Sequence, residues 1–290
     1  MTSQSRAPLR AASNPLPLSE VPEWHDEADV LIVGYGGAGV CAAIEAATAG
    51  AETLVLERAS GGGGTTAMAA GHIYMGGGTR VQKACGYEDT ADNLLRYLEA
   101  SAEDSDPEKF RLYAESSVAH FEWLERLGVP FEDSIHEART NMQQSAECLL
   151  WSGNEKAWPF CEIATPAPRG HKVAQEGEAG PLLFAKLDDA ARTAGARIEA
   201  DTRVLTLVMD DHGRVEGVLA RQAGEDRCFR ARRGVILCAG GYAMDESMFA
   251  RHIPRLAGRV TAIGNPYDDG AGLRMGLAAR GSGLHLADYH

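Results

Sequence analysis

Residues 28–57 read ADVLIVGYGGAGVCAAIEAATAGAETLVLE. Ala28–Val33 is almost continuously apolar, which is typical of a parallel strand covered on both faces. In the turn that follows, Gly34 permits the sharp bend, Gly36 lets the backbone approach a diphosphate, and Gly39 lets the next helix pack on the strands. The stretch therefore predicts a strand–turn–helix–strand unit of a parallel α/β domain.

A carboxylate ends the second strand of this unit. Glu57 lies where it can accept hydrogen bonds from ribose hydroxyls, and it would repel a 2′-phosphate. The intervening helix points its N–H groups and positive dipole end at the turn. A glycine pattern alone is weak evidence because glycines often only make turns, but strand, helix and acid all occur here in the expected order. We predict a dinucleotide site.

Composition bounds the remaining function classes. The chain has 290 residues, 44% hydrophobic and 24% charged, as in a globular protein with ample length for a buried core. A net charge of −13 argues against nucleic-acid and anionic-membrane partners, and no apolar run is long enough to span a bilayer. Residues 1–27 lack the apolar segment of a secretory signal, so we expect a disordered leader and a cytoplasmic protein.

The cysteines and histidines show no metal-site spacing. There is no CxxC, HxxxH or HExxH pattern, and we expect reduced thiols and no metal rather than disulfides. The six cysteines are Cys41, Cys85, Cys148, Cys161, Cys228 and Cys238.

The middle of the chain alternates between regular and irregular stretches. A glycine/threonine loop at 60–66 suits backbone lying against a flat ligand, although a flexible linker is the alternative. Helices are predicted from Thr90, as N-cap, to Ala102, and from Asp106-Pro107 to just before Gly128. Residues 129–180 show no sustained period, which is typical of functional loops. Residues 181–194 again have helical spacing.

The last third of the chain reads as short strands. Residues 203–209, 214–221 and 228–231 predict a three-stranded antiparallel meander. Residues 234–241 (GVILCAGG) then predict a buried strand that rejoins the parallel sheet and places its terminal glycines beside the first turn. Asp268-Asp269-Gly270 opens a final helix of small residues.

These motifs, in this order, resemble FAD-dependent flavoproteins of the group that includes fumarate reductase, the succinate dehydrogenase flavoprotein and the 3-ketosteroid dehydrogenases. The likeness runs from about Ala28 to Ala287 and rests on GYGGAG with Glu57, the glycine/threonine loop, the meander, VILCAGG and the DDG segment. The resemblance implies a Rossmann-like, glutathione-reductase-like FAD domain with a separate substrate-capping domain.

The resemblance also implies which residues bind FAD. The adenosine and pyrophosphate side would be formed by Gly34, Gly36, Gly37, Ala38, Gly39, Glu57, Arg58, Val204, Ala239 and Gly240. The pyrophosphate–isoalloxazine side near flavin N5 would be formed by Thr65, Thr66, Ala70 and Gly71. Asp269 would accept a hydrogen bond near the ribityl chain or phosphate. Thr65 stands where succinate dehydrogenase relatives carry their FAD-linked histidine, so we expect non-covalent FAD.

The family continues past the DDG segment with a capping domain and a closing motif over the flavin. Neither is present in residues 28–290, so we expect an incomplete FAD-binding domain, either a fragment or a truncated product. Such a chain would expose apolar surface and show weak or no turnover.

The run GHIYMGGGTRVQ (71–82) most resembles the 3-ketosteroid Δ4-dehydrogenase branch, which implies oxidation of a saturated 3-ketosteroid with hydride transfer to flavin N5 and an unidentified electron acceptor. A fumarate-type ene reductase acting on an enoic acid and a non-catalytic nucleotide-binding remnant remain open. No catalytic residue is assigned. His72 and Tyr74 could face the steroid ring system or pack in a strand behind the flavin. Arg169 and His171 could bind an acidic substrate or lie in a solvated loop.

Overall fold

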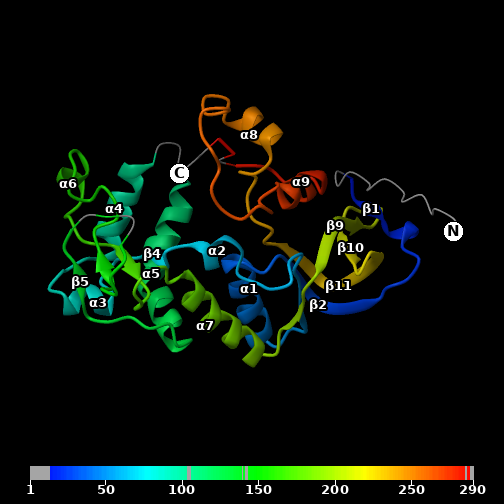
Figure 1. Ribbon diagram of the computed structural model, residues 1–290, viewed down its shortest axis with the longest axis horizontal. Coiled ribbons are helices and arrows are strands. Elements are labelled where there is room, and N and C mark those ends of the chain that lie inside the picture. Colours follow the sequence, from blue (N-terminus) through cyan, green and yellow to red (C-terminus); the bar gives the residue numbers. More distant parts are fainter. Residues whose placement is uncertain (1–13, 103–105, 139, 141–142, 285, 288–290) are drawn as a thin grey trace. The chain divides into compact units, whose positions relative to one another are not determined.

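The computed structural model describes residues 14–102, 106–138, 140, 143–284 and 286–287 (Figure 1). The chain divides into two compact units, the first formed by residues 1–65 and 191–290 and the second by residues 66–190. No helix in the described ranges is both long enough and apolar enough to cross a bilayer.

The first unit is built on a seven-stranded sheet with the order β1-β9-β10-β11-β2-β3-β8. Strand β2 pairs in parallel with β11 on one side and β3 on the other, and β3 pairs in parallel with β8. The strands are β1 (Leu16–Pro17), β2 (Asp26–Val33), β3 (Thr53–Leu56), β8 (Arg197–Glu199), β9 (Thr202–Met209), β10 (Val215–Gln222) and β11 (Glu225–Leu237). The predicted α/β fold class with a parallel sheet is confirmed.

The helices of this unit are α1 (Gly37–Thr48), α8 (Glu246–His252) and α9 (Ala271–Ala278), with a short 3₁₀ turn η1 (Leu18–Glu20). Apolar residues explain how the sheet is covered. Leu31 and Leu54 are fully buried in one core cluster that also contains Val204 and Met275 of α9. Every residue of β3 is buried, as its continuous apolar run predicts.

The meander of β9, β10 and β11 is antiparallel throughout, as predicted. One detail differs from the prediction. The segments expected as separate strands, 228–231 and 234–241, are joined in one long strand that ends at Leu237, with a register shift between Ala231 and Gly234 where it passes beside β2. A single strand can thus pair with β10 through its first half and with β2 through its second half.

The structure differs from the leader expectation over residues 14–27. Leu16 is buried and pairs with Val208 as part of β1, and β2 begins at Asp26. Leu16, Val208 and Cys228 form a small apolar cluster. Burial in this cluster explains why Leu16 and Pro17 form a strand instead of a disordered leader. Residues 1–13 of the expected leader lie outside the described residues.

The second unit holds a four-stranded sheet with the order β4-β7-β6-β5. Its elements are β4 (His72–Tyr74), α3 (Arg80–Ala84), α4 (Ala91–Ser101), α5 (Pro107–Arg126), β5 (Ile135–His136), β6 (Leu149–Leu150), α6 (Phe160–Ile163) and β7 (Gly170–Lys172). Helices α2 (Gly64–Met68) and α7 (Gly180–Thr193) cross the boundaries between the two units.

Two of the predicted caps in this unit are confirmed. The Thr90 side chain accepts a hydrogen bond from the Asn93 N–H at the start of α4, and Asp106 caps α5. Before α7 begins at Gly180, the described part of the stretch 129–180, which has no sequence period, contains strands of two or three residues and the single turn of α6. Elements this short leave no periodic signal in the sequence.

Candidate functional site

The glycine turn after β2 lies against the end of β11. A Cβ atom added at Gly34, where φ is 96°, would lie 2.5 Å from the carbonyl oxygen of Cys238. A Cβ atom added at Gly39 would lie 2.1 Å from the carbonyl oxygen of Gly34. Both glycines are therefore required by contacts within the protein, which hold α1 close to the strand ends.

Gly36 is different, because none of the described residues requires a glycine there. Its backbone is extended (φ −90°, ψ −162°), and an added Cβ atom would find only the Gly63 carbonyl oxygen, at an ordinary 3.7 Å. Gly36 is also the N-cap of α1 and contributes no side-chain cap. The turn thus has room for a group beside the positive end of a helix, as a bound diphosphate requires.

Glu57 directly follows β3 and is held by two backbone donors. Its Oε2 atom accepts from the Tyr35 N–H at 2.7 Å and its Oε1 atom accepts from the Ala59 N–H at 2.8 Å. An ionised carboxylate has about four acceptor positions. Glu57 therefore keeps capacity for ribose hydroxyls while its orientation is fixed next to the turn.

Arg58 and Asp269 form an ion pair. Arg58 Nη1 donates to Asp269 Oδ2 at 2.9 Å, its guanidinium lies 4.1 Å from the centre of the Tyr267 ring, and Arg203 approaches the same carboxylate at 3.8 Å. Burial, the largest single effect, raises the pKa of Asp269. The hydrogen bonds from Arg58 and the Ala271 N–H, together with the charges of Arg58 and Arg203, outweigh burial and hold the pKa below its ordinary value. Asp269 thereby ties the loop before α9 to the end of β3, and its predicted contact with FAD stays a prediction.

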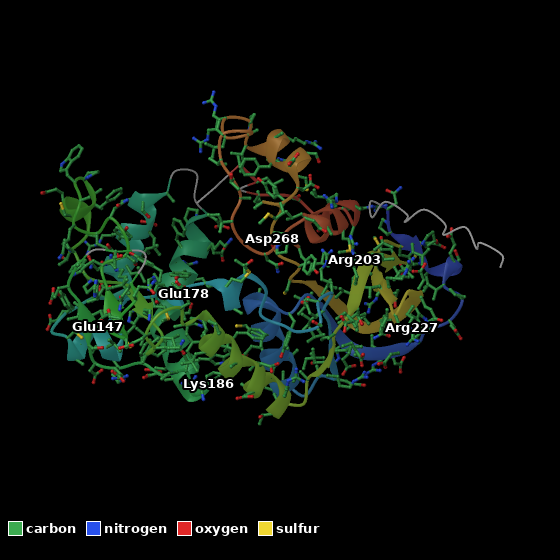
Figure 2. The ribbon with its side chains drawn as sticks, in the orientation of Figure 1. Glu147, Glu178, Lys186, Arg203, Arg227 and Asp268 are labelled. Atoms are coloured by element: carbon green, nitrogen blue, oxygen red, sulfur yellow. The ribbon has the colours of Figure 1, made fainter. Side chains whose placement is uncertain are left out.

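Asp268 is the residue that sequence reasoning missed. It lies on the loop between α8 and α9 (Figure 2). Its carboxylate accepts from the Thr65 hydroxyl and from the Gly241 N–H, each at 3.3 Å. A Cβ atom added at Gly240 would lie 2.2 Å from Asp268 Oδ1. The doubled acid of the DDG motif was the available signal, but only its second member was selected.

The glycines at the end of β11 do lie beside the first turn. The Cys238 N–H donates to the Val33 carbonyl at 2.8 Å, and Ala239 follows within contact of Gly34. Helix α9 approaches Ala239 closely because Gly272 has no side chain. Val204 lies on β9, buried and paired with Ala220. Gly34, Gly36, Gly39, Glu57 and the 239–241 turn thus gather at the carboxyl edge of one sheet, where open α/β sheets bind ligands.

The predicted flavin-side residues divide between the two units. Thr65 belongs to the first unit and contacts Asp268. Thr66, Ala70 and Gly71 belong to the second unit, where the Ala179 N–H donates to the Ala70 carbonyl at 3.2 Å and Gly71 packs on Ala179. The role of these three residues at a flavin stays a prediction.

Arg169 and His171 do not lie in a solvated loop, because both are fully buried. Arg169 makes two hydrogen bonds to Asp89, at 2.9 and 3.0 Å, and lies 4.9 Å from the Tyr97 ring centre. Burial alone would raise the pKa of Asp89, but the hydrogen bond and charge of Arg169 hold it below its ordinary value. These contacts assign Arg169 to the interior of the second unit.

Tyr74 is also occupied within the second unit. Its hydroxyl donates to Glu155 Oε1 at 2.9 Å, and Glu155 itself is 1% exposed. Burial, followed by the charge of Glu155, raises the pKa of Tyr74 far above its ordinary value. The hydroxyl therefore keeps its proton and is unsuited to act as a tyrosinate base.

His171 predicts a measurable pH dependence of stability. Burial lowers its pKa to about 4, while the side chain contacts the Thr79 hydroxyl at 2.8 Å and the Arg169 carbonyl at 3.1 Å. Above pH ~6.5 the ring is neutral in both states. Between pH ~6.5 and 4, the imidazole binds a proton in the unfolded state but stays neutral in the folded state. The free energy of unfolding therefore falls by about 3 kcal/mol over this range. His171→Gln should remove this part of the pH dependence in denaturant titrations.

The control for this titration is His212→Gln, which alters an exposed histidine on the β9–β10 turn. Because this side chain is exposed, the change should leave the unfolding free energy at neutral pH as in the wild type. A His171→Gln protein with an unchanged slope between pH 6.5 and 4 would contradict the assignment of a buried neutral ring.

The cysteines provide no second site. All six are free thiols, and burial raises the pKa of Cys41 to about 11. Within the described ranges, no group of three or more histidine, cysteine or carboxylate side chains is arranged to hold a metal ion.

Comparison with known proteins places the chain in a family. The model of the FAD binding domain family matches residues 29–288, so the chain belongs to the FAD binding domain family. A 3-oxo-5-alpha-steroid 4-dehydrogenase of Comamonas testosteroni is 37% identical over 202 residues, which are 68% of this chain and 38% of that protein. A probable fumarate reductase of Shewanella frigidimarina is 27% identical over 81% of this chain and 37% of its own length.

A solved structure gives the same result. The 3-ketosteroid-Δ4-(5α)-dehydrogenase of Rhodococcus jostii RHA1, in complex with 4-androstene-3,17-dione, is 45% identical and superposes with a TM-score of 0.87. The superposition covers 92% of this chain and 56% of that structure. The predicted family resemblance and the FAD cofactor are thus confirmed, and the chain spans about half or less of the length of the relatives that it matches.

Proposed function

We propose that this chain is the FAD-binding part of an oxidoreductase that dehydrogenates a CH–CH bond next to the carbonyl of a 3-ketosteroid or similar ketone. The observation that carries the proposal is the open position at Gly36 beside the start of α1. The likeness to the steroid dehydrogenases supports the choice of substrate, because it is higher than the likeness to the fumarate reductase.

The residues present fit FAD. The N–H groups at Gly36, Gly37, Ala38 and Gly39 would hold the diphosphate at the helix start, and Glu57 would hold the adenosine ribose. FAD, when bound, supplies the hydride acceptor of the reaction. The protein's own part is to fix the position of the coenzyme through main-chain contacts that need no side-chain rearrangement.

Two other functions are compatible with an FAD-binding chain. A fumarate-reductase-like ene reductase is supported by the fumarate reductase relatives, and a nucleotide-binding protein without catalysis is the third candidate. The electron partner is unidentified, and we propose the cytoplasm as the location because the scattered cysteines suit a reducing compartment.

Anaerobic half-reactions separate the candidates. Because the chain is only the FAD-binding part, we expect the FAD-loaded protein to lose its visible flavin absorbance slowly, in a single turnover, when a saturated 3-ketosteroid is added. Fumarate should not reoxidise dithionite-reduced protein. Reoxidation by fumarate without any steroid response would favour the ene reductase. Neither response, with FAD bound, would leave the nucleotide-binding alternative and reject dehydrogenation by this chain.

We also propose that FAD is bound without a covalent link. Thr65 has a hydroxyl that contacts Asp268, and it offers no imidazole for attachment. After acid precipitation the flavin should stay in the supernatant. A yellow pellet that survives washing would refute non-covalent binding.

A further inference from the structure

The Asp268 side chain connects two glycine-rich segments, the loop that ends at Gly64-Thr65 and the 239–241 turn after β11. Its two carboxylate oxygens accept from Thr65 and Gly241. Thr65 follows Gly64, and a Cβ atom added at Gly64 would lie 3.6 Å from the Gly36 Cα atom. Through Thr65 and Gly64, the Asp268 carboxylate is therefore close to Gly36, the open position in the turn after β2.

Asp268 and Asp269 differ in their electrostatic surroundings. Asp269 is neutralised by Arg58 at 2.9 Å and is approached by Arg203 at 3.8 Å. In the part of the chain that the structure describes, the side-chain contacts of Asp268 are with the Thr65 hydroxyl and the Gly241 N–H, and neither group carries a compensating charge. A negative charge and a diphosphate in one neighbourhood repel each other.

We propose that Asp268 sets the affinity for the coenzyme. Its carboxylate competes with the dinucleotide diphosphate for the Thr65 hydroxyl and the Gly241 N–H. This inference rests on the proposed dinucleotide site. Asp268 holds the 264–270 loop to the Thr65 and Gly241 segments, and a diphosphate weakens that hold by repulsion. The residue thus makes coenzyme binding weaker and more easily reversed than the glycine turn alone would allow.

The test removes the charge and keeps the shape. Asp268→Asn retains an oxygen that can accept from Gly241 or Thr65. It should bind ADP and FAD about tenfold more tightly than the wild type in calorimetric titrations. Because the gain arises at the diphosphate, it should be of similar size for both ligands. Asp268→Ser provides a second neutral variant if the asparagine protein is unstable.

The matched control is Asp211→Asn on the exposed β9–β10 turn, which changes net charge equally and should leave both affinities unchanged. Weaker FAD binding by Asp268→Asn with unaltered ADP binding would overturn the proposal and make Asp268 an acceptor for the ribityl chain. Unaltered affinity for both ligands would also overturn it. If wild type and both Asp268 variants bind neither ligand, the proposed dinucleotide site fails as well, which distinguishes the two failures.

Discussion

Gly36→Ala should cost the protein its FAD and leave its fold intact. Among the described residues, the atom nearest to the added methyl group is the Gly63 carbonyl oxygen at 3.7 Å, and the extended backbone at this position suits any residue. The same methyl group would occupy the place of the diphosphate. Loss of two main-chain hydrogen bonds to a charged group, at roughly 1.5–3 kcal/mol each, predicts at least about a 100-fold weaker affinity. Calorimetric titration with FAD measures this affinity.

Two other glycines provide the controls. Gly234→Ala adds a methyl group to open space on β11 and should change neither FAD affinity nor the unfolding midpoint. Gly39→Ala forces a contact of 2.1 Å with a backbone oxygen and should destabilise the protein itself. Full FAD retention by a folded Gly36→Ala protein would contradict the assignment of the turn.

Arg169→Met should give the largest loss of stability. The pair with Asp89 has no exposed side-chain surface on either partner, so removing the guanidinium leaves a buried carboxylate without its cation. Broken buried pairs typically cost about 3–5 kcal/mol. Unfolding in denaturant, followed by tryptophan fluorescence, measures the difference from the wild type.

The pH dependence of this difference identifies its cause. In the wild type, the lowered pKa of Asp89 contributes stability that is present above pH ~4 and is lost as pH falls through the folded-state value. In Arg169→Met, the buried acid is stabilised by taking up a proton, so the gap to the wild type should narrow from pH 7 to pH 4. A constant gap would indicate lost packing alone.

Arg96→Met is the surface control for the buried pair. Arg96 pairs with Asp92 on α4 with both side chains largely exposed. The change should cost no more than about 0.5 kcal/mol. A cost comparable to that of Arg169→Met would contradict the distinction between the buried and exposed pairs.

The sequence predicted the parts of the fold whose signals are local. The apolar run at 28–33, the glycine turn and the Thr90 and Asp106 caps each depend on neighbouring residues, and the structure confirms these elements. The strand β1 at Leu16–Pro17 could not be predicted, because it depends on pairing with Val208, which is far away in the sequence. The short strands of residues 129–180 were missed because runs of two or three residues leave no periodic signal in the sequence.

The glycine positions of the candidate site were predicted from the sequence, but the partners of its charged side chains were not. Glycine spacing indicates where a backbone must bend, so Gly34, Gly36 and Gly39 could be found in advance. The partner of a charged side chain depends on tertiary contacts. Arg58 with Asp269, and Asp89 with Arg169, are separated by long stretches of chain, and no local pattern indicates them.

In the proposed site, main-chain groups hold the diphosphate of an adenine dinucleotide. Calorimetry of the wild-type chain with FAD, ADP and riboflavin tests this directly. FAD and ADP should both bind, and riboflavin, which lacks the diphosphate and adenine, should bind far more weakly than either. Riboflavin binding as strong as that of FAD, or no binding of ADP, would contradict the account.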